Sequence, residues 1–98
     1  MKVEISTRAQ REAKRLDSWW REHRDAQELF ALEFQEAVEI LGTVRIPGAP
    51  WPTSRRPRLR RLLLKKTKRH VYFEIFERKQ VVRIVTVWGA PRKPPPKL

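Results

Sequence analysis

The chain has 98 residues and a formal net charge of +12, and a chain of this length supports one hydrophobic core because it buries about 60–70% of its unfolded surface. It has no cysteine, which excludes disulfides, thiolate catalysis and cysteine-based zinc sites. Its start lacks the apolar segment of a signal peptide and no run of about 18 apolar residues follows, so we expect a cytoplasmic protein that does not enter a membrane.

The positive charge is concentrated in the second half of the chain. Residues 1–45 carry eight Lys and Arg against nine Asp and Glu, whereas residues 46–98 carry fifteen against two. Uncompensated positive charges repel one another, so the folded chain is stabilised by an anionic partner such as nucleic acid, the ribosome or an acidic protein segment. The alternative is that the charge serves only solubility.

A short strand and a helix are predicted at the start. Residues 2–6 alternate polar and apolar side chains, as a half-buried strand does. Thr7 has the character of a helix N-cap, and Gln10 completes a weak capping box. Apolar side chains then recur at helical spacing, which predicts a helix over about 8–22; they are Ala9, Ala13, Leu16 and Trp20.

A second amphipathic helix follows. Asp25 and Glu28 form another capping box, and Gly42 stands where a C-terminal cap is expected, because glycine enters the left-handed conformation at little cost. The apolar positions between them are Leu29, Phe30, Phe34, Ala37, Val38 and Leu41. Two helices joined by a tight loop indicate an antiparallel hairpin.

The rest of the chain is predicted to be a loop and three strands. Residues 46–57 contain four prolines and are not expected to form regular structure. Stretches rich in aliphatic, β-branched or aromatic residues predict strands at about 58–66, 70–77 and 81–88, and the last two form a hairpin. Residues 91–98 are a basic, proline-rich tail.

The predicted element order is therefore β-α-α-β-β-β. It describes a single α+β domain over residues 1–98, in which an antiparallel sheet carries the helical hairpin on one face. The opposite face of the sheet is then free to form a shallow groove.

Residues 55–70 hold nine cations and no acid: Arg55, Arg56, Arg58, Arg60, Arg61, Lys65, Lys66, Lys68 and Arg69. Leucines interleaved with them anchor the run to the core, which predicts a fixed array of cations on the free face. A fixed array binds phosphate or carboxylate groups well because little order is lost on docking. The alternative is an ordinary solvated surface.

The strand at 70–77 divides its side chains between two faces. Its period of two directs Val71, Phe73 and Ile75 toward the helices, and His70, Tyr72, Glu74 and Phe76 toward the free face. His70 and Tyr72 could stack on a base there, or could be ordinary strand residues that make cross-strand contacts. Trp51 and Trp88 are expected to be accessible to a partner.

Metal-dependent and nucleotide-dependent chemistry is not indicated, since there are only two histidines and no phosphate-binding glycine loop. We therefore expect no cofactor and no metal. Cleavage of a phosphodiester without metal needs a base, an electrophile and a group that assists the leaving oxygen. His70 or Glu74, a lysine or arginine, and Arg92 or Lys93 are the candidates for these roles.

The segment RLRRLLLKKTKRHVYFEIFERKQVVRIVTVWGAPRK resembles the three C-terminal strands of RelE/ParE-type toxins, and HVYFEI and VVRIVTVWGAPR carry most of the resemblance. The element order also matches that family over nearly the whole chain. The resemblance implies the toxin of a type II toxin–antitoxin pair, bound by an acidic antitoxin and reaching operator DNA only through that antitoxin.

Two activities occur in this family: ParE-like members inhibit DNA gyrase, and RelE-like members cleave mRNA on the ribosome without a metal. The positions that resemble those of the cleaving members are Lys65, Lys66, His70, Arg92 and Lys93. The tail departs from the cleaving pattern, because three prolines and no histidine or tyrosine follow Lys93. Gyrase inhibition is thus the leading interpretation, with RNA cleavage and a non-toxic RNA- or ribosome-binding module as alternatives.

The residues predicted to bind nucleic acid or the antitoxin combine the basic run with neighbouring aromatic and tail residues. They are Arg58, Arg60, Arg61, Lys65, Lys66, Lys68, Arg69, Tyr72, Trp88, Arg92 and Lys93.

Overall fold

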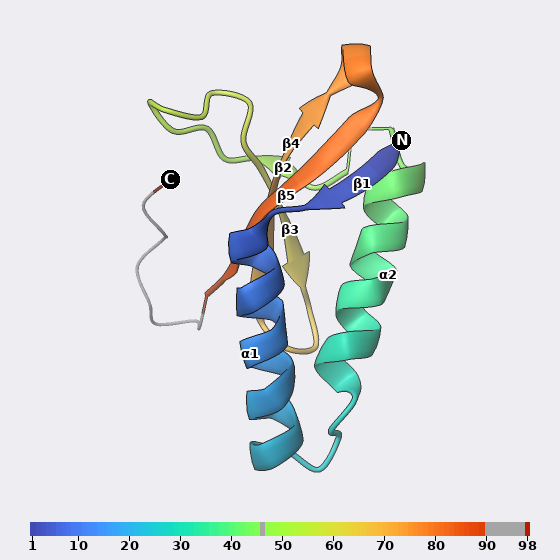
Figure 1. Cartoon of the computed structure of the whole chain (residues 1–98), viewed down its shortest axis with the longest axis vertical. Coiled ribbons are helices and arrows are strands. Elements are labelled where there is room, and N and C mark those ends of the chain that lie inside the picture. Colours follow the sequence, from blue (N-terminus) through green and yellow to red (C-terminus); the bar gives the residue numbers. More distant parts are fainter. Residues whose placement is uncertain (46, 90–97) are drawn as a thin grey trace.

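In the computed structural model, which describes residues 1–45, 47–89 and 98, two helices lie against one side of a sheet (Figure 1). The elements are β1 Lys2–Ile5, α1 Thr7–His23, α2 Leu29–Thr43, β2 Ala49–Pro50, β3 Arg60–Leu64, β4 Arg69–Phe76, the 3-10 helix η1 Glu77–Lys79, and β5 Val81–Trp88. The predicted α+β class and the element order are confirmed, and β2 is an addition to that order.

The sheet is mixed, with the strand order β1-β5-β4-β3-β2. β1 runs parallel to β5, with Lys2 opposite Val81, whereas the other neighbouring strands are antiparallel. The expectation of antiparallel pairing throughout is wrong at this edge. The direction of β1 depends on where the helical hairpin returns the chain, and no local pattern in β1 itself specifies that.

The proline-rich loop contains the edge strand β2, so the prediction that residues 46–57 hold no regular structure is wrong for two of them. β2 pairs with Arg60 and Arg61 of β3. Proline is tolerated on an edge strand because the missing N–H faces away from the ladder. Gly48 precedes β2 with φ +68°, and a Cβ there would lie 2.4 Å from the Arg61 carbonyl oxygen, so only glycine fits this approach.

The helix ends differ slightly from the predicted ones. Ser6, rather than Thr7, caps α1, because its hydroxyl oxygen accepts the backbone N–H three residues on at 3.0 Å. Glu28 makes no side-chain capping bond at the start of α2. Gly42 lies inside α2 rather than beyond its end, and its carbonyl oxygen accepts the Met1 ammonium at 2.7 Å.

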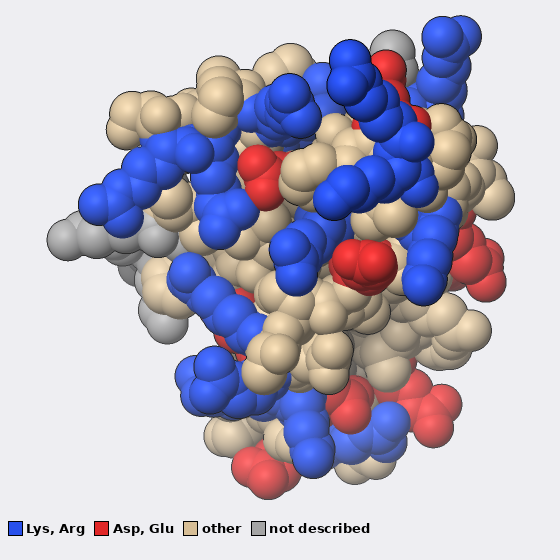
Figure 2. All heavy atoms as spheres, turned by 45° about the horizontal axis from the view of Figure 1, so that its top comes forward, with Lys and Arg blue, Asp and Glu red and all other residues tan. Residues whose placement is uncertain are grey.

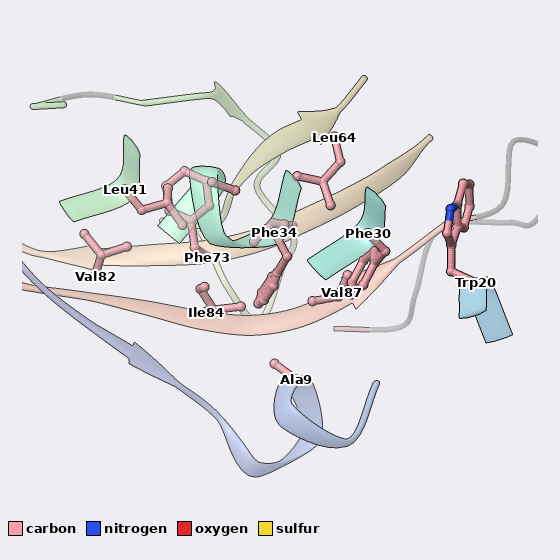
Figure 3. Packing of buried hydrophobic residues seen from close by; sticks show 12 residues of the cluster. Ala9, Trp20, Phe30, Phe34, Leu41, Leu64, Phe73, Val82, Ile84 and Val87 are labelled. Atoms are coloured by element: carbon pink, nitrogen blue, oxygen red, sulfur yellow. The ribbon is translucent and has the colours of Figure 1, made fainter. Parts of the chain in front are cut away.

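The main core lies between the helices and the sheet (Figure 3). Phe30, Phe34 and Leu41 of α2 pack against Phe73 and Ile84 of the two central strands, and all five are at most 8% exposed. Burial of each such side chain contributes about 1.5–3 kcal/mol of hydrophobic stabilisation. The apolar spacing of the helices and the period of two in β4 therefore direct their side chains into one core.

A β-bulge connects the sheet to α1. The register between β4 and β5 shifts between Tyr72 and Phe73, so that Val85 has no partner in the ladder. Beyond the bulge, the hydroxyl of Thr86 donates to the carboxylate of Glu12 on α1. The bulge thus lies next to the residue through which β5 makes a polar contact with α1.

No helix in the described parts of the chain combines the length and the apolar character needed to cross a lipid bilayer.

Candidate functional site

The face of the sheet that points away from the helices is set by the period of β4. Val71 and Phe73 belong to the core beneath the helices, so His70 and Tyr72 project to the other side. The prediction for these side chains is confirmed. Cross-strand partners share a face, and the surface that we call the outer face comprises Arg61, Leu63, His70, Tyr72 and Glu74.

The loop before β3 covers part of the outer face. Leu59, which is 1% exposed, packs with Tyr72 and Val85 in a second apolar cluster, and Trp88 and Leu98 pack against it. Tyr72 is only 2% exposed. The prediction that Tyr72 lies open for stacking on a base is wrong for this conformation, because Leu59 lies in the same cluster as its ring.

Glu74 is held by an ion pair on the outer face. The guanidinium of Arg56 donates to its carboxylate at 2.7 Å, and the backbone N–H of Arg56 donates to the hydroxyl of Thr53 at 2.9 Å. This charge-assisted bond occupies one oxygen of the carboxylate. Glu74 therefore anchors the covering loop, and His70 remains the better-placed candidate base.

His70 lies at the end of β4 beside Tyr72, with 6.1 Å between their ring centroids. A Cβ at Gly89 would lie 3.3 Å from His70 Nδ1, and Gly89 has φ +108°, so the backbone just after β5 passes close to the imidazole. Partial burial lowers the pKa of His70 from its usual 6.5, and the charge of Arg61 lowers it further. At neutral pH the imidazole is therefore uncharged and can accept a proton.

Arg61 is the cation of the basic run whose charge lowers the pKa of His70. Its guanidinium stacks on the ring of Trp51, 3.7 Å from the ring centroid. Trp51 is 37% exposed, as predicted for a side chain accessible to a partner. Arg61, Trp51 and His70 thus place a fixed cation, an aromatic ring and a neutral imidazole around one side of the sheet.

The basic run does not form one array, which corrects the sequence prediction. Arg60 donates to the carbonyl oxygens of Pro47 and Gly48 at 3.0 and 3.1 Å, whereas its neighbour Arg61 lies on the outer face. Successive residues of a strand point to opposite faces, so a contiguous run of cations in β3 is necessarily divided. The described cations of the run are ordered but occupy separate surfaces.

Two further groups of cations lie away from the outer face. Arg58 and Arg60 line a hollow at the tip of the β4–β5 hairpin together with Arg78 and Lys79. Lys66, Lys68 and Arg69 lie beside α1 in the turn region after β3. Figure 2 likewise shows Lys and Arg spread over one face of the molecule, interrupted by acidic and other side chains, rather than gathered in a single groove.

The residues proposed for RNA cleavage are not brought together as a set in the described chain. Lys66 lines a hollow with Trp20 and Arg24 on the helix side, whereas His70 lies on the outer face. Lys65 is exposed in the turn after β3. Arg92 and Lys93 lie outside the described residues. Across residues 1–45, 47–89 and 98, no three His, Cys, Asp or Glu side chains are grouped so that they could hold a metal.

Arg24, the C-cap of α1, and Arg78 of η1 contribute to these surfaces, although the sequence alone assigned them no functional role. Arg24 lies near Lys66 and Arg69, and Arg78 lies near Arg58. Both arginines are exposed, and neither forms an ion pair within the described residues. To find them from the sequence, one would have to know that the end of α1 lies beside the β3–β4 turn and that η1 lies beside the start of β3.

Comparison with known proteins finds no family model and no curated protein that matches this sequence. Solved structures match at the level of fold. A chain of the intact E. coli RelBE toxin–antitoxin complex is 18% identical with a TM-score of 0.61, over 93% of this chain and 98% of that chain. The isolated E. coli RelE toxin is 18% identical with a TM-score of 0.65, over 94% of this chain and 86% of that chain. The chain therefore has the RelE fold over nearly its whole length.

Proposed function

We propose that this chain, which has the RelE fold, is the growth-inhibiting toxin of a toxin–antitoxin pair and acts in the cytoplasm. The observation that carries the proposal is the mutual coverage of 93% and 98% with a chain of the RelBE complex, which leaves little of either chain without a counterpart. Because fold alone does not determine activity, the outer face supplies the second support. It holds Arg61, Trp51 and His70 in fixed positions.

The proposed partner is an acidic antitoxin. The excess positive charge of the second half of the chain favours an acidic segment that screens it. The homologous fold has been crystallised in a complex described as toxin and antitoxin, which supports a protein partner of this kind. Operator DNA would then be contacted through the antitoxin.

The first proposed target is DNA gyrase. The sequence strings around β4 and β5 resemble ParE-like members more than cleaving ones, and Lys66 and His70 lie on different sides of the sheet. Inhibition by binding needs only a surface of fixed cations and aromatic rings. Unlike cleavage of RNA, it does not require several side chains to act on the same phosphodiester bond.

The second candidate is cleavage of mRNA on the ribosome, and His70 is the observation that favours it. A neutral imidazole near a guanidinium can take a proton from a ribose hydroxyl while the cation stabilises the developing negative charge on phosphate. Burial and Arg61 both lower the pKa of His70, which keeps the imidazole neutral at physiological pH. Arg61 would then be the electrophile.

Induction of the chain in bacteria tests the proposal directly. We expect growth to stop, and growth to resume when an acidic protein encoded by the neighbouring reading frame is produced as well. The variant Arg61→Gln should inhibit growth less than the control variant Arg45→Gln, which removes one exposed cation just beyond the C-terminal end of α2. Unimpaired growth together with tight, salt-dependent RNA binding would instead favour a non-toxic RNA- or ribosome-binding module.

The two targets are separated by replacing the histidines one at a time. If His70 is a general base, His70→Ala lowers RNA cleavage by about 10²-fold or more and abolishes toxicity, whereas His23→Ala on α1 leaves both intact. If gyrase is the target, the purified chain inhibits supercoiling by gyrase, and the variant His70→Ala keeps most of this inhibition. Mapping of mRNA 5′ ends in the induced cells reports on cleavage independently.

A further inference from the structure

A hollow of about 390 Å³ opens between the C-terminal half of α1 and the turn that joins β3 to β4. We call it the basic hollow, and it is lined by Trp19, Trp20, Arg24, Lys66, Thr67, Lys68 and Arg69. These lining residues, all within the described part of the chain, include four cations and no acid. Because α1 forms one wall of the hollow and lies on the helix side of the sheet (Figure 1), the hollow is distinct from the outer face.

The turn that forms one wall of the basic hollow is held rigidly by α2. The carboxylate of Glu33 accepts the backbone N–H groups of Lys66 and Thr67 at 2.7 and 2.9 Å, and the hydroxyl of Thr67 at 2.7 Å. Lys68 has φ 60°, a left-handed conformation that non-glycine residues seldom adopt. Glu33 is thus engaged with the turn, and the lysine side chains project from a fixed backbone.

Two guanidinium groups of like charge meet in the basic hollow. Arg69 is anchored by donating to the carbonyl oxygens of Thr67 and Gly89 at 3.1 and 3.4 Å. Burial lowers the pKa of Arg69, and the charge of Arg24 lowers it further. Neither guanidinium takes part in an ion pair among the described residues. The free chain therefore holds a repulsive arrangement that a bound anion would relieve.

The tryptophans add a hydrogen-bond donor and an apolar wall. Trp20 is 9% exposed and lies at the end of the row of core side chains in Figure 3. Its indole N–H is buried and has no acceptor among the described residues, although a buried indole usually has one. A carboxylate bound by the cations of the hollow would bring an acceptor and a negative charge to the side of this ring.

We propose that the basic hollow is a docking site for an acidic peptide segment, in which a Glu or Asp carboxylate is bound by Arg24, Lys66 and Lys68 while apolar neighbours pack on the tryptophans. A nucleic acid fits less well because ring faces that a base would stack on already have partners. Trp19 stacks on His23 at 4.8 Å, and Arg24 lies 5.4 and 5.7 Å from the two indole centroids. A base would have to displace His23 or Arg24, whereas an aliphatic side chain can pack against the part of Trp19 that stays exposed.

The surroundings of the basic hollow also favour a peptide over a polynucleotide. Residues 7–43, which include both helices, carry eight acidic and six basic side chains. A phosphate backbone that left the hollow along the helices would meet this acidic surface, whereas a peptide can present one carboxylate and then continue with apolar or neutral residues. Identification of the peptide as part of the antitoxin rests on the proposed function, but the site itself does not.

The test uses the full chain labelled with nitrogen-15, and follows the indole N–H signals by NMR. The probe is a short peptide that alternates Glu and Leu, and the signal of Trp20 is assigned from the variant Trp20→Phe. We expect the peptide to shift the Trp20 signal and the same peptide with Gln in place of Glu to leave it unchanged. Raising the salt from about 0.01 M to about 1 M should weaken the binding, because the Debye length falls from about 30 Å to about 3 Å.

Matched variants locate the site. Arg24→Gln combined with Lys68→Gln should weaken peptide binding by about tenfold for each cation removed. Arg11→Gln combined with Lys14→Gln removes the same charge from α1 outside the hollow and should leave binding nearly unchanged. Lys68→Gln alone, at an exposed side chain, should weaken binding without any loss of folded signals.

Three outcomes would overturn the assignment: no shift at Trp20, equal loss of affinity in both double variants, or a shift produced by a single-stranded oligonucleotide but not by the Glu-containing peptide. The growth assay is read separately. A toxic chain without peptide binding refutes only the docking site, and peptide binding by a chain that does not inhibit growth refutes only the toxin proposal.

Discussion

His70 has properties that its place in a basic, strand-forming segment does not reveal. The sequence marks it as one of two histidines and predicts the face on which it lies. Its pKa depends on partial burial and on Arg61, which comes from a different strand. The character of this residue is thus set by a neighbour nine positions earlier in the chain.

Replacing Arg61 should raise the pKa of His70. In Arg61→Gln one positive charge is removed from the surroundings of the imidazole, so protonation becomes easier, while partial burial still holds the pKa below its usual 6.5. The measurement is an NMR titration of the His70 ring protons. Arg83→Gln, at an exposed position of β5, is the matched control, and an equal shift in that variant would contradict a local effect of Arg61.

The same depression of the pKa predicts how stability depends on pH. Because the folded chain binds the His70 proton less readily than the unfolded chain, the unfolded state takes up that proton first as the pH falls below about 6.5. The free energy of unfolding should therefore decrease over that range, and His70→Gln should reduce this decrease. Urea unfolding at several pH values gives both curves.

At the scale of elements, Glu33 joins α2 to the turn between β3 and β4. Its carboxylate accepts two backbone N–H groups and one hydroxyl, all within 2.9 Å. Helix and turn are more than thirty residues apart in sequence, and periodicity does not indicate that they meet. A glutamate on the partly exposed side of an amphipathic helix is ordinarily interpreted as a solvated residue.

Loss of this carboxylate should destabilise the fold. In Glu33→Ala the N–H of Thr67 and its buried hydroxyl lose their acceptor, and we expect the free energy of unfolding to fall by about 2–3 kcal/mol, which is typical when hydrogen bonds to a charged group are removed. Urea denaturation measures the change. Glu36→Ala, one turn along the same helix and exposed, should change stability little, and equal effects of the two variants would contradict this role.

For the whole molecule, the uneven distribution of charge has a consequence for stability in salt. The second half of the chain carries fifteen basic and two acidic side chains, and only one ion pair in the described part, Arg56 with Glu74, involves that half. Like charges on one compact unit repel one another through solvent at low ionic strength.

Added salt should therefore stabilise the folded chain. Raising sodium chloride from about 0.01 M to about 0.15 M shortens the Debye length from about 30 Å to about 8 Å and screens this repulsion, so Tm should rise. The variant Arg78→Glu with Arg83→Glu, at two exposed positions, lowers the net charge and should show a smaller rise. A Tm that falls with salt, or an equal rise in the variant, would show that charge repulsion does not control how the stability of the folded chain depends on salt.

The sequence by itself determined the elements and their faces. Helical spacing in α1 and α2, and the period of two in β4, are local properties of the chain, and they correctly predict that Phe30, Phe34 and Phe73 meet in one core. The division of charge between the halves is likewise visible in the sequence. These features were predictable because neighbouring residues alone specify which side of an element is apolar.

Only the tertiary structure decided which surfaces the cations form. Alternation within β3 sends Arg60 and Arg61 to opposite faces, the loop bearing Leu59 covers Tyr72, and the helical hairpin brings Arg24 to Arg69. Each of these contacts joins segments that are distant in sequence, and its geometry depends on the packing of the whole core. The single basic face expected from the sequence is for that reason replaced by three separate surfaces: the outer face, the hollow at the tip of the β4–β5 hairpin and the basic hollow beside α1.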